Sequence, residues 1–225
     1  MISKLEIDHN TREKCYKCYR PKSSCMCKYV NEIDTKTKFI ILMHPREFKK
    51  TKNGTGHFTH LSLPNSQIYI GIDFSNNVKI NNIVNNSSYN CFILYPGKDT
   101  IKLNNTNIQE KNKTNVIFII DSTWACSVKM LRLSKNLHHL QRVSFEHSKS
   151  SAFKIKTQPN SYCLSTIEST LCVLELLNKH KIENIKDDKL LNFLKPFEKM
   201  VDYQFNCAIE SGDETVRYKK PYIKL

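Results

Sequence analysis

Residues 115–124 read NVIFIIDSTW, an apolar run that stops abruptly at Asp121. A run that is apolar on both faces is typical of a strand in a parallel sheet that helices cover on both sides. In open sheets of this kind, ligands bind just beyond the carboxyl ends of the strands. The sequence therefore predicts a buried strand over residues 115–121, with Asp121 and the residues after it at a functional site.

Three further runs have the same character. They lie at residues 38–44 (KFIILMH), 67–72 (QIYIGI) and 90–95 (NCFILY). His44 ends the first of them, and Pro96, Gly97 and Lys98 follow the third, so polar residues recur where strands stop. One more short strand is predicted at 142–146. The pattern predicts an α/β fold with a mostly parallel sheet and flanking helices.

Helices are predicted over residues 123–134, 165–177 and 187–209. The second is the clearest, because its apolar residues recur at helical spacing. Ser165 and Glu168 have the spacing of a capping box at its start. The Asn-rich stretch 76–90 is interpreted as a loop or an irregular helix.

The chain of 225 residues carries a net charge of +14. A strongly positive field attracts polyanions, so nucleic acid is the expected partner. A compositional bias toward Lys, Asn and Ile also explains the charge, which would equally suit a membrane surface or an acidic protein. No apolar run approaches the length of a membrane span, and residues 1–15 lack the apolar core of a signal peptide. We therefore expect a cytoplasmic protein.

Four of the nine cysteines lie close together near the N-terminus. They form a C-x-x-C and a C-x-C, namely Cys15, Cys18, Cys25 and Cys27. Thiolates at this spacing can share one tetrahedral zinc, which would stabilise a segment that lacks a core of its own; four free thiols in a loop are the alternative. No thioredoxin-like pattern surrounds them, which argues against redox catalysis. We expect a cysteine (zinc) knuckle in residues 1–30, packed on a main domain of residues 31–225.

Asp121 and Trp124 each have two explanations. A carboxylate at a strand end can act as a general base, or it can cap the helix that follows. Trp124 is the only tryptophan of the chain, and it can stack on a nucleobase or lie in the core. The residues alone leave these alternatives open.

Three loops are also ambiguous. The segment that contains His44 and Arg46 ends in a Gly-flanked turn at 53–56, whose amides could cradle an anion or serve only turn geometry. Lys98 could anchor a carboxylate or phosphate after the Pro-Gly turn. The helix that opens at 164–168 (LSTIE) offers free amides to a carboxylate, although the capping box accounts for its polar side chains.

The order of these motifs is more specific than any one of them. Along the chain come C-x-x-C-x-R-P with C-x-C, HP-x-E with a TG turn, LYPGK, a strand that ends in D-x-TW, and LSTIE. In this order they resemble the DTW-domain family, whose name records Asp121, Thr123 and Trp124 as they stand here. The resemblance spans residues 15–177, most of the chain.

The resemblance implies a tRNA-uridine aminocarboxypropyltransferase of the SPOUT-like superfamily. Such an enzyme transfers the 3-amino-3-carboxypropyl group of S-adenosylmethionine (SAM) to nitrogen 3 of a tRNA uridine and releases 5′-methylthioadenosine. The implied fold is a parallel sheet with a C-terminal trefoil knot that forms the SAM site. The implied partner is tRNA, bound by a monomer or a homodimer.

The resemblance also implies roles for individual residues. Asp121 is the expected general base. Lys98 and Arg46 are candidates for the SAM carboxylate. The expected SAM-binding residues are Tyr95, Pro96, Gly97, Lys98, Thr123, Trp124, Leu164, Ser165 and Thr166. The expected RNA-binding residues are Arg46, Lys129, Arg132, Lys135 and Arg142. The expected zinc ligands are Cys15, Cys18, Cys25 and Cys27.

Three departures and three rival functions accompany this interpretation. Ser122 stands where many members have Gly, the loop before Gly56 is one residue longer than the common form, and the helix after Trp124 lacks an early basic residue, for which Lys129 is the substitute. The rivals are a SPOUT-like RNA methyltransferase, a non-catalytic zinc-knuckle RNA-binding protein, and a zinc-dependent structural protein whose charge is only compositional.

Overall fold

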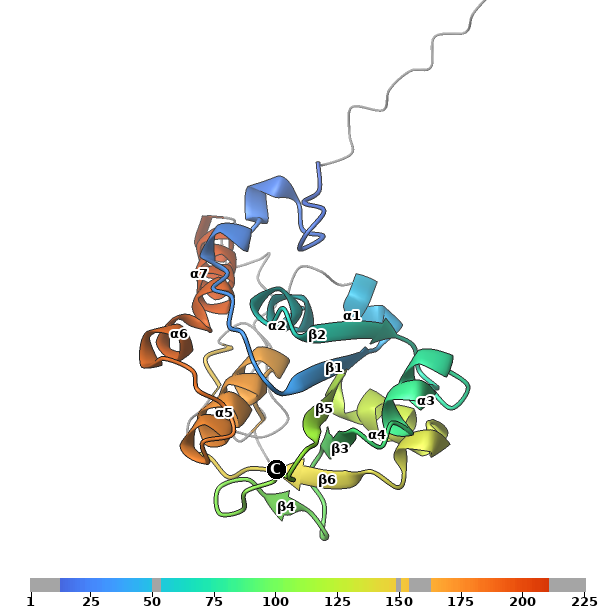
Figure 1. Cartoon of the computed structure of the whole chain (residues 1–225). Coiled ribbons are helices and arrows are strands. Elements are labelled where there is room, and N and C mark those ends of the chain that lie inside the picture. The colour runs from blue at the N-terminus through green and yellow to red at the C-terminus, as the bar shows by residue number, and fades with distance from the viewer. Residues whose placement is uncertain (1–12, 50–53, 149–150, 154–162, 211–225) are drawn as a thin grey trace, which may run out of the picture.

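The computed structural model describes residues 13–49, 54–148, 151–153 and 163–210 (Figure 1). Its strands are β1 (Lys38–Met43), β2 (Ser66–Ile70), β3 (Tyr89–Leu94), β4 (Ile101–Lys102), β5 (Thr114–Asp121) and β6 (Gln141–Ser144). Its α-helices are α1 (Pro45–Lys49), α2 (Gly56–Ser62), α3 (Val78–Val84), α4 (Trp124–Leu133), α5 (Thr166–Lys179), α6 (Asp187–Asn192) and α7 (Lys195–Glu210). Its 3₁₀ turns are η1 (Lys22–Ser24), η2 (Cys27–Tyr29) and η3 (Lys135–Leu137).

The strands form one sheet in the order β2-β1-β5-β3-β6-β4. Each pairing in this sheet is parallel. Strand β5 lies at the centre, where Ile117 is opposite Phe39 of β1 on one side and Phe92 of β3 on the other. The predicted α/β class, the parallel sheet and the central place of 115–121 are thus confirmed, because a strand paired on both edges and covered on both faces must be apolar throughout.

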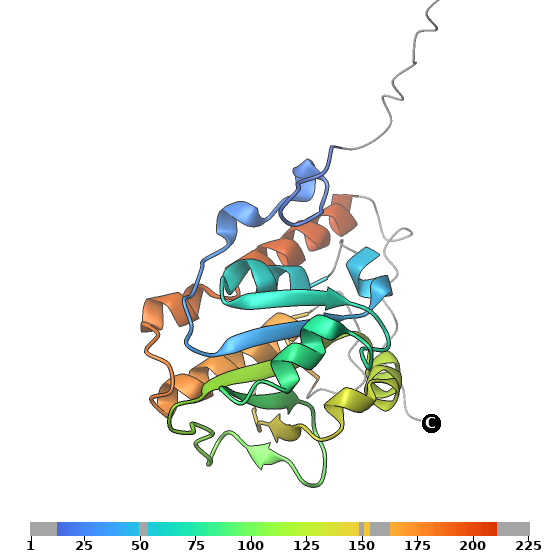
Figure 2. The same ribbon diagram turned by 45° about the vertical axis from the view of Figure 1, so that its right-hand side comes forward.

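Alternate residues of the strands face two separate cores, as the twofold period of a strand requires. Phe39 and Ile117 face a core that also receives Phe58 of α2, Ile167 of α5 and Phe197 of α7. The residues next to them in the strands face the second core, which α3 and α4 cover: Ile40, Leu42, Ile93, Val116 and Phe118, with Ile80 and Met130 from the helices. Figures 1 and 2 show α5, α6 and α7 on one side of the sheet and α3 and α4 on the other.

Helix α5 begins with the capping box expected from the sequence. The backbone N–H of Ser165 donates to the carboxylate of Glu168 at 2.8 Å, and the Ser165 side chain accepts from the backbone in return. The same buried carboxylate accepts bonds from the hydroxyl of Ser151 and the N–H of Ala152, both at 2.8 Å. Glu168 therefore both starts the helix and fixes the segment in front of it.

The predicted C-terminal helix over 187–209 is wrong in one respect, because the structure divides it into α6 and α7. Pro196 lies in the first turn of α7, where its missing N–H costs nothing. In a continuous helix Pro196 would have to donate an N–H to the carbonyl of Asn192 and its ring would clash there, so α6 ends at Asn192. Within the stretch 76–90, the side chain of Asn77 accepts from the N–H of Ile80 and caps the short helix α3.

Three short elements were not expected from the sequence. Helices α1 and α2 lie in the segment interpreted as a loop with a Gly-flanked turn, and strand β4 contains only Ile101 and Lys102. Elements of two to seven residues lack the repeated apolar period from which longer elements are recognised. The turn begins in a stretch outside the described residues, but Gly56 is the first residue of α2.

The path between β6 and α5 includes residues 149–150 and 154–162, which lie outside the described residues. The trefoil knot and the SPOUT-like topology therefore stay predictions. Within the described part of the chain, no helix has both the length and the apolar character needed to cross a membrane.

Candidate active site

A cavity of about 240 Å³ lies beyond the carboxyl ends of β3, β5 and β6. It is lined by Leu94, Tyr95, Pro96, Ile119, Ile120, Ser122, Trp124, Ser127, Val143, Ser144, Phe145, His147, Leu164, Thr166 and Ser169. Parallel strands bring these residues together from distant parts of the chain, because their carboxyl ends share one edge of the sheet. Its lining combines apolar side chains with six hydroxyl groups, which suits a small organic molecule that carries polar groups.

Asp121 ends β5, and its side chain is buried. It does not itself line the cavity, but its chain neighbours Ile120 and Ser122 do. The hydroxyl of Thr166 donates to its Oδ1 at 2.6 Å. Gly56 lies against the other carboxylate oxygen, because a Cβ atom built on this glycine would overlap Oδ2 of Asp121. The carboxylate is therefore held between the first residue of α5 and the first residue of α2.

Asp121 is not the N-cap of α4. That position belongs to Thr123, and no side chain caps this helix. The backbone carbonyl of Asp121 accepts from the N–H of His44 at 3.0 Å, which ties the end of β5 to the end of β1. Helix capping thus does not account for a carboxylate at this position.

An aromatic pair forms the rim of the cavity. The rings of Tyr95 and Trp124 lie 6.1 Å apart, centroid to centroid. Trp124 is 43% exposed, so it is not the core tryptophan that was one of its two explanations. The guanidinium of Arg142 lies 5.7 Å from the Tyr95 ring centroid. Such a rim can stack a planar heterocycle and place a positive charge beside it.

The four N-terminal cysteines converge on one point. Their sulfur atoms all lie within 4.8 Å of one another, and the Cys15–Cys27 and Cys18–Cys25 pairs are each 3.7 Å apart. Four sulfurs bound tetrahedrally at the usual zinc–sulfur length would be about 3.8 Å apart. The backbone N–H of Cys18 lowers the pKa of Cys15 to about 6, whereas burial raises the pKa of Cys25 and of Cys27, so it is the spacing of the sulfurs that favours a metal. These residues can therefore hold a metal ion.

The cysteine segment shares the core of the main sheet. Cys18 and Met26 belong to the first hydrophobic core, and η2 packs against α7 (Figure 1). Tyr19 adopts a left-handed backbone with φ 59°, which lets the chain turn back between Cys18 and Arg20. The cysteine segment in residues 13–30 thus packs on α7 and shares the first core, while the boundary at residue 30 stays a prediction.

The DTW domain model matches residues 12–205, which includes the cysteine cluster, Asp121 and the cavity. The chain belongs to the DTW domain family. Three curated relatives are all named tRNA-uridine aminocarboxypropyltransferase 2. The Macaca fascicularis protein is 27% identical over 86% of this chain and 64% of its own length. The Mus musculus protein is 27% identical over 97% and 71%, and the Drosophila melanogaster protein 28% over 89% and 79%.

The chain thus spans just under two thirds of the macaque relative and more of the other two. No solved structure gives a significant match. The expected DTW resemblance is confirmed. The three residues that name the family, Asp121, Thr123 and Trp124, lie at the junction of β5 and α4. Asp121 is buried there and Trp124 is exposed.

The residues expected to bind SAM in a DTW protein divide into two groups. Those that line the cavity are Tyr95, Pro96, Trp124, Leu164 and Thr166. Those that are adjacent in the chain but do not line it are Gly97, Lys98, Thr123 and Ser165. Gly97 instead lies against Arg142, whose Nη1 would be 3.0 Å from a Cβ atom at this glycine. Their roles stay predictions.

The sequence interpretation missed the contribution of β6 to the DTW cavity. Ser144, Phe145 and His147 line it, and the rings of Phe145 and His147 lie 5.7 Å apart. The rule that placed Asp121 at a site, a polar residue after a strand, applies equally to this stretch. It was overlooked because the predicted strand, 142–146, extended past the point where β6 ends at Ser144.

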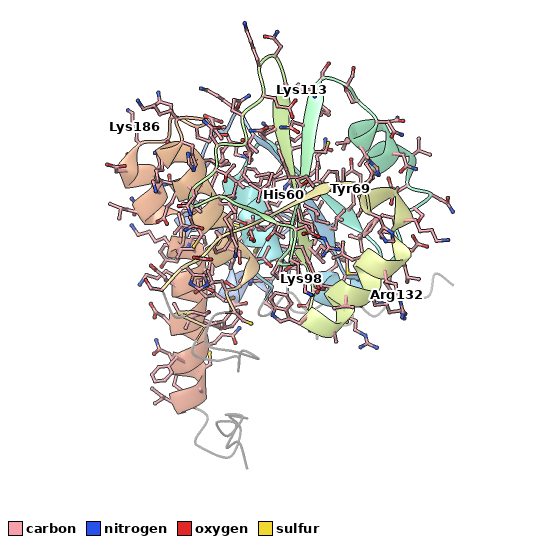
Figure 3. The ribbon with its side chains drawn as sticks, turned by 90° about the horizontal axis from the view of Figure 1, so that it is seen from below. His60, Tyr69, Lys98, Lys113, Arg132 and Lys186 are labelled. Atoms are coloured by element: carbon pink, nitrogen blue, oxygen red, sulfur yellow. The ribbon has the colours of Figure 1, made fainter. Side chains whose placement is uncertain are left out.

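The basic residues expected to bind RNA are all exposed, on α1, α4, η3 and β6: Arg46, Lys129, Arg132, Lys135 and Arg142. Figure 3 shows Lys98 and Arg132 toward the same end of the molecule, whereas Lys113, just before β5, lies at the other end of the strands. Arg142 is unlike the others because it touches the cavity rim. The structure thus places one of these cations, Arg142, at the cavity rim, and it assigns none of them a ligand.

Proposed function

We propose that this protein transfers the 3-amino-3-carboxypropyl group of SAM to nitrogen 3 of a uridine in tRNA. The products are 3-(3-amino-3-carboxypropyl)uridine and 5′-methylthioadenosine. The observation that carries the proposal is the buried carboxylate of Asp121 beside a ligand-sized cavity, in a chain whose relatives bear the name of this activity. Family membership supports the class of reaction, and the geometry supports where it occurs.

Asp121 supplies the base that this reaction needs. Nitrogen 3 of uracil carries a proton at neutral pH and is a poor nucleophile until that proton is removed. In the proposed step the proton passes to the Asp121 carboxylate, a bond forms between nitrogen 3 and the aminocarboxypropyl carbon, and the carbon–sulfur bond breaks with its electron pair left on sulfur. Thr166 fixes the carboxylate during the step through its 2.6 Å hydrogen bond.

The cavity is the proposed SAM site. Tyr95 and Trp124 offer aromatic surface to the adenine or the uracil. Thr166 both lines the cavity and bonds to Asp121, so it connects the cavity with the general base. Lys98 follows β3, and Arg142 lies in β6. Either cation could pair with the carboxylate of the amino acid part of SAM. Orientation decides which group on sulfur is transferred, so this anchoring would separate aminocarboxypropyl transfer from methyl transfer.

The exposed cations of α4 and η3 are the proposed tRNA contact. Lys129, Arg132 and Lys135 follow Trp124 along one continuous stretch, so a tRNA backbone held there would present a nucleotide to the cavity rim. The target uridine must be unpaired or flipped, because stacking and pairing hide its imide. Contacts to phosphates supply affinity without sequence information.

Zinc is the proposed metal for the cysteine cluster. Four thiolates at tetrahedral separation suit zinc, and the cluster lies away from the cavity-lining residues, so its role would be structural. The metal would hold residues 15–27 in their turn, a segment with few apolar side chains of its own.

The test is product analysis with purified protein, unmodified tRNA transcripts and SAM. After digestion, mass spectrometry should find a uridine heavier by the aminocarboxypropyl group, together with released 5′-methylthioadenosine. A methylated nucleoside with S-adenosylhomocysteine would overturn the chemistry in favour of a methyltransferase. Tight tRNA binding without a product or any thermal stabilisation by SAM would favour a non-catalytic RNA-binding protein.

A further inference from the structure

Arg20 is the most deeply buried cation in the described part of the chain, with 1% of its surface exposed. It lies two residues after Cys18, and its guanidinium lies 3.8 Å from the Phe58 ring centroid. Its Nη2 donates to the carbonyl of Gly54 at 2.9 Å and contacts the sulfur of Met200 at 3.3 Å. One side chain of the cysteine knuckle thus reaches both α2 and α7.

A guanidinium buried this deeply requires a compensating negative charge. Among the described residues, no carboxylate forms an ion pair with Arg20, and its Nε and Nη1 have no hydrogen-bond partner. The backbone N–H of Cys15 donates to the carbonyl of Arg20 at 2.7 Å, so Arg20 belongs to the same turn that brings the four sulfurs together. Four thiolates around a divalent ion carry a net charge of about −2, which is the charge that this environment otherwise lacks.

The residues that Arg20 contacts at the start of α2 lie close to the candidate active site. Gly54 and Phe58 flank the start of α2, whose first residue is Gly56. Gly56 in turn lies against Oδ2 of Asp121, at a distance that leaves no room for a methyl group. Tyr19 strengthens the same link, because its ring lies 5.5 Å from that of Phe48 in α1 and 5.3 Å from that of His57 in α2.

We propose that Arg20 is a positioning residue that couples the metal-bound cysteine cluster to α2, and through Gly56 to the carboxylate of Asp121. The cluster supplies the charge that keeps the guanidinium in place, and the guanidinium holds the Gly54 carbonyl and the Phe58 ring. Metal loss would then loosen the start of α2 as well as the knuckle. The inference rests on the proposed metal site and activity.

The charge part of the proposal is tested by zinc affinity, measured by competition with a chelator in the full-length protein. Arg20→Met keeps the volume and removes the charge, and should weaken zinc binding about 10–100-fold, the usual effect of losing a partner next to a metal ligand. Arg20→Lys keeps the charge but loses the planar guanidinium that lies over Phe58, so its zinc affinity should fall between those of the wild type and Arg20→Met. Lys22→Met removes a charge from the same knuckle, at a side chain that is 59% exposed, and should stay within about twofold.

The coupling part needs no substitution, so it holds even if Arg20→Met does not fold. Removing the metal from the wild-type protein should speed amide hydrogen exchange in α2 at least about tenfold, and leave α3, on the opposite face of the sheet, unchanged. In zinc-saturated Arg20→Met, kcat should fall while KM for SAM stays within about threefold, because the carboxylate moves and the cavity does not.

The outcomes separate this proposal from the one on which it rests. A wild-type protein that binds no zinc would overturn both the coupling through Arg20 and the proposed zinc site. Wild-type zinc binding with an equally tight Arg20→Met, or with Arg20→Lys as weak as Arg20→Met, would overturn the coupling through charge. Exchange in α2 that does not respond to the metal would overturn the link to the active site, and would leave the transferase activity untouched.

Discussion

The hydroxyl of Thr166 donates a 2.6 Å hydrogen bond to Oδ1 of Asp121, and so joins the first residue of α5 to the last residue of β5. The two residues are 45 positions apart in the chain. A hydrogen bond to a charged group contributes more than one between neutral groups, because the charge strengthens it. Thr166 thereby fixes the direction of the carboxylate beside the cavity.

Replacing Thr166 with Val should therefore lower turnover about tenfold or more, because the hydroxyl is lost while the shape is kept. Thr166→Ser keeps the hydroxyl and should stay within about threefold of the wild type. Thr170→Val is the matched control one turn later, where the hydroxyl bonds only to the carbonyl of Thr166. Turnover by single-turnover kinetics decides the matter: equal rates for Thr166→Val and the wild type would remove Thr166 from the site.

Replacing Gly56 with Ala should abolish most activity and lower stability by about 1–3 kcal/mol, because the new methyl group would overlap Asp121 and Met43. Gly71→Ala is the control, since its Cβ atom meets the Phe74 ring at 2.9 Å, away from the carboxylate. Both variants should lose stability in urea unfolding, but only Gly56→Ala should lose turnover at a temperature where both are folded. Full activity in Gly56→Ala would show that the carboxylate position is not critical.

The burial of His57 should make the free energy of unfolding depend on pH in the acidic range. Burial, followed by the charge of Arg20, lowers the pKa of His57 to about 4 from its usual 6.5. Between these values the unfolded chain binds more protons than the folded protein, so the free energy of unfolding falls as the pH drops through this window, and the full contribution is present only above pH 6.5. Compared with His57→Phe, the wild type should lose about 2 kcal/mol more between pH 6.5 and pH 4 in urea titrations. Parallel pH profiles would contradict this.

The exposed cations of α4 predict a change in the salt dependence of tRNA binding. If Arg132 contacts a phosphate, Arg132→Gln should flatten the slope of log K against log salt concentration by about one unit. Lys113→Gln is the control, because Lys113 lies at the other end of the strands, beside Glu110 (Figure 3). Filter binding over a range of salt concentrations measures both slopes. A slope unchanged in Arg132→Gln would count against α4 as the tRNA surface.

Much of this fold could be predicted from the sequence, because its central strands are buried on both faces and read as continuous apolar runs. The same runs placed Asp121 at the carboxyl edge of the sheet, where the structure has the cavity. The capping box of Ser165 and Glu168 was equally legible, since it depends on residues three apart. Patterns of this kind depend only on residues close together in the chain, so they can be recognised without knowledge of the tertiary contacts.

The features that the sequence did not reveal depend on contacts between distant residues. Nothing near Gly56 indicates that it lies against Asp121, and Arg20 looks like any surface arginine until α2 and α7 enclose it. His147 was not predicted to line the cavity, because the predicted strand ended at residue 146 and β6 ends at Ser144. Where strand ends and tertiary contacts decide a site, local sequence patterns carry too little information.

The central claim is that Asp121 performs the chemistry beside a site that binds SAM independently of it. The most direct test measures SAM affinity by calorimetry and aminocarboxypropyl transfer to tRNA by mass spectrometry in one preparation of Asp121→Asn. The account predicts that turnover falls about 10²–10⁴-fold while the Kd for SAM stays within about threefold of the wild type. Wild-type turnover, or a loss of SAM binding as large as the loss of turnover, would contradict it.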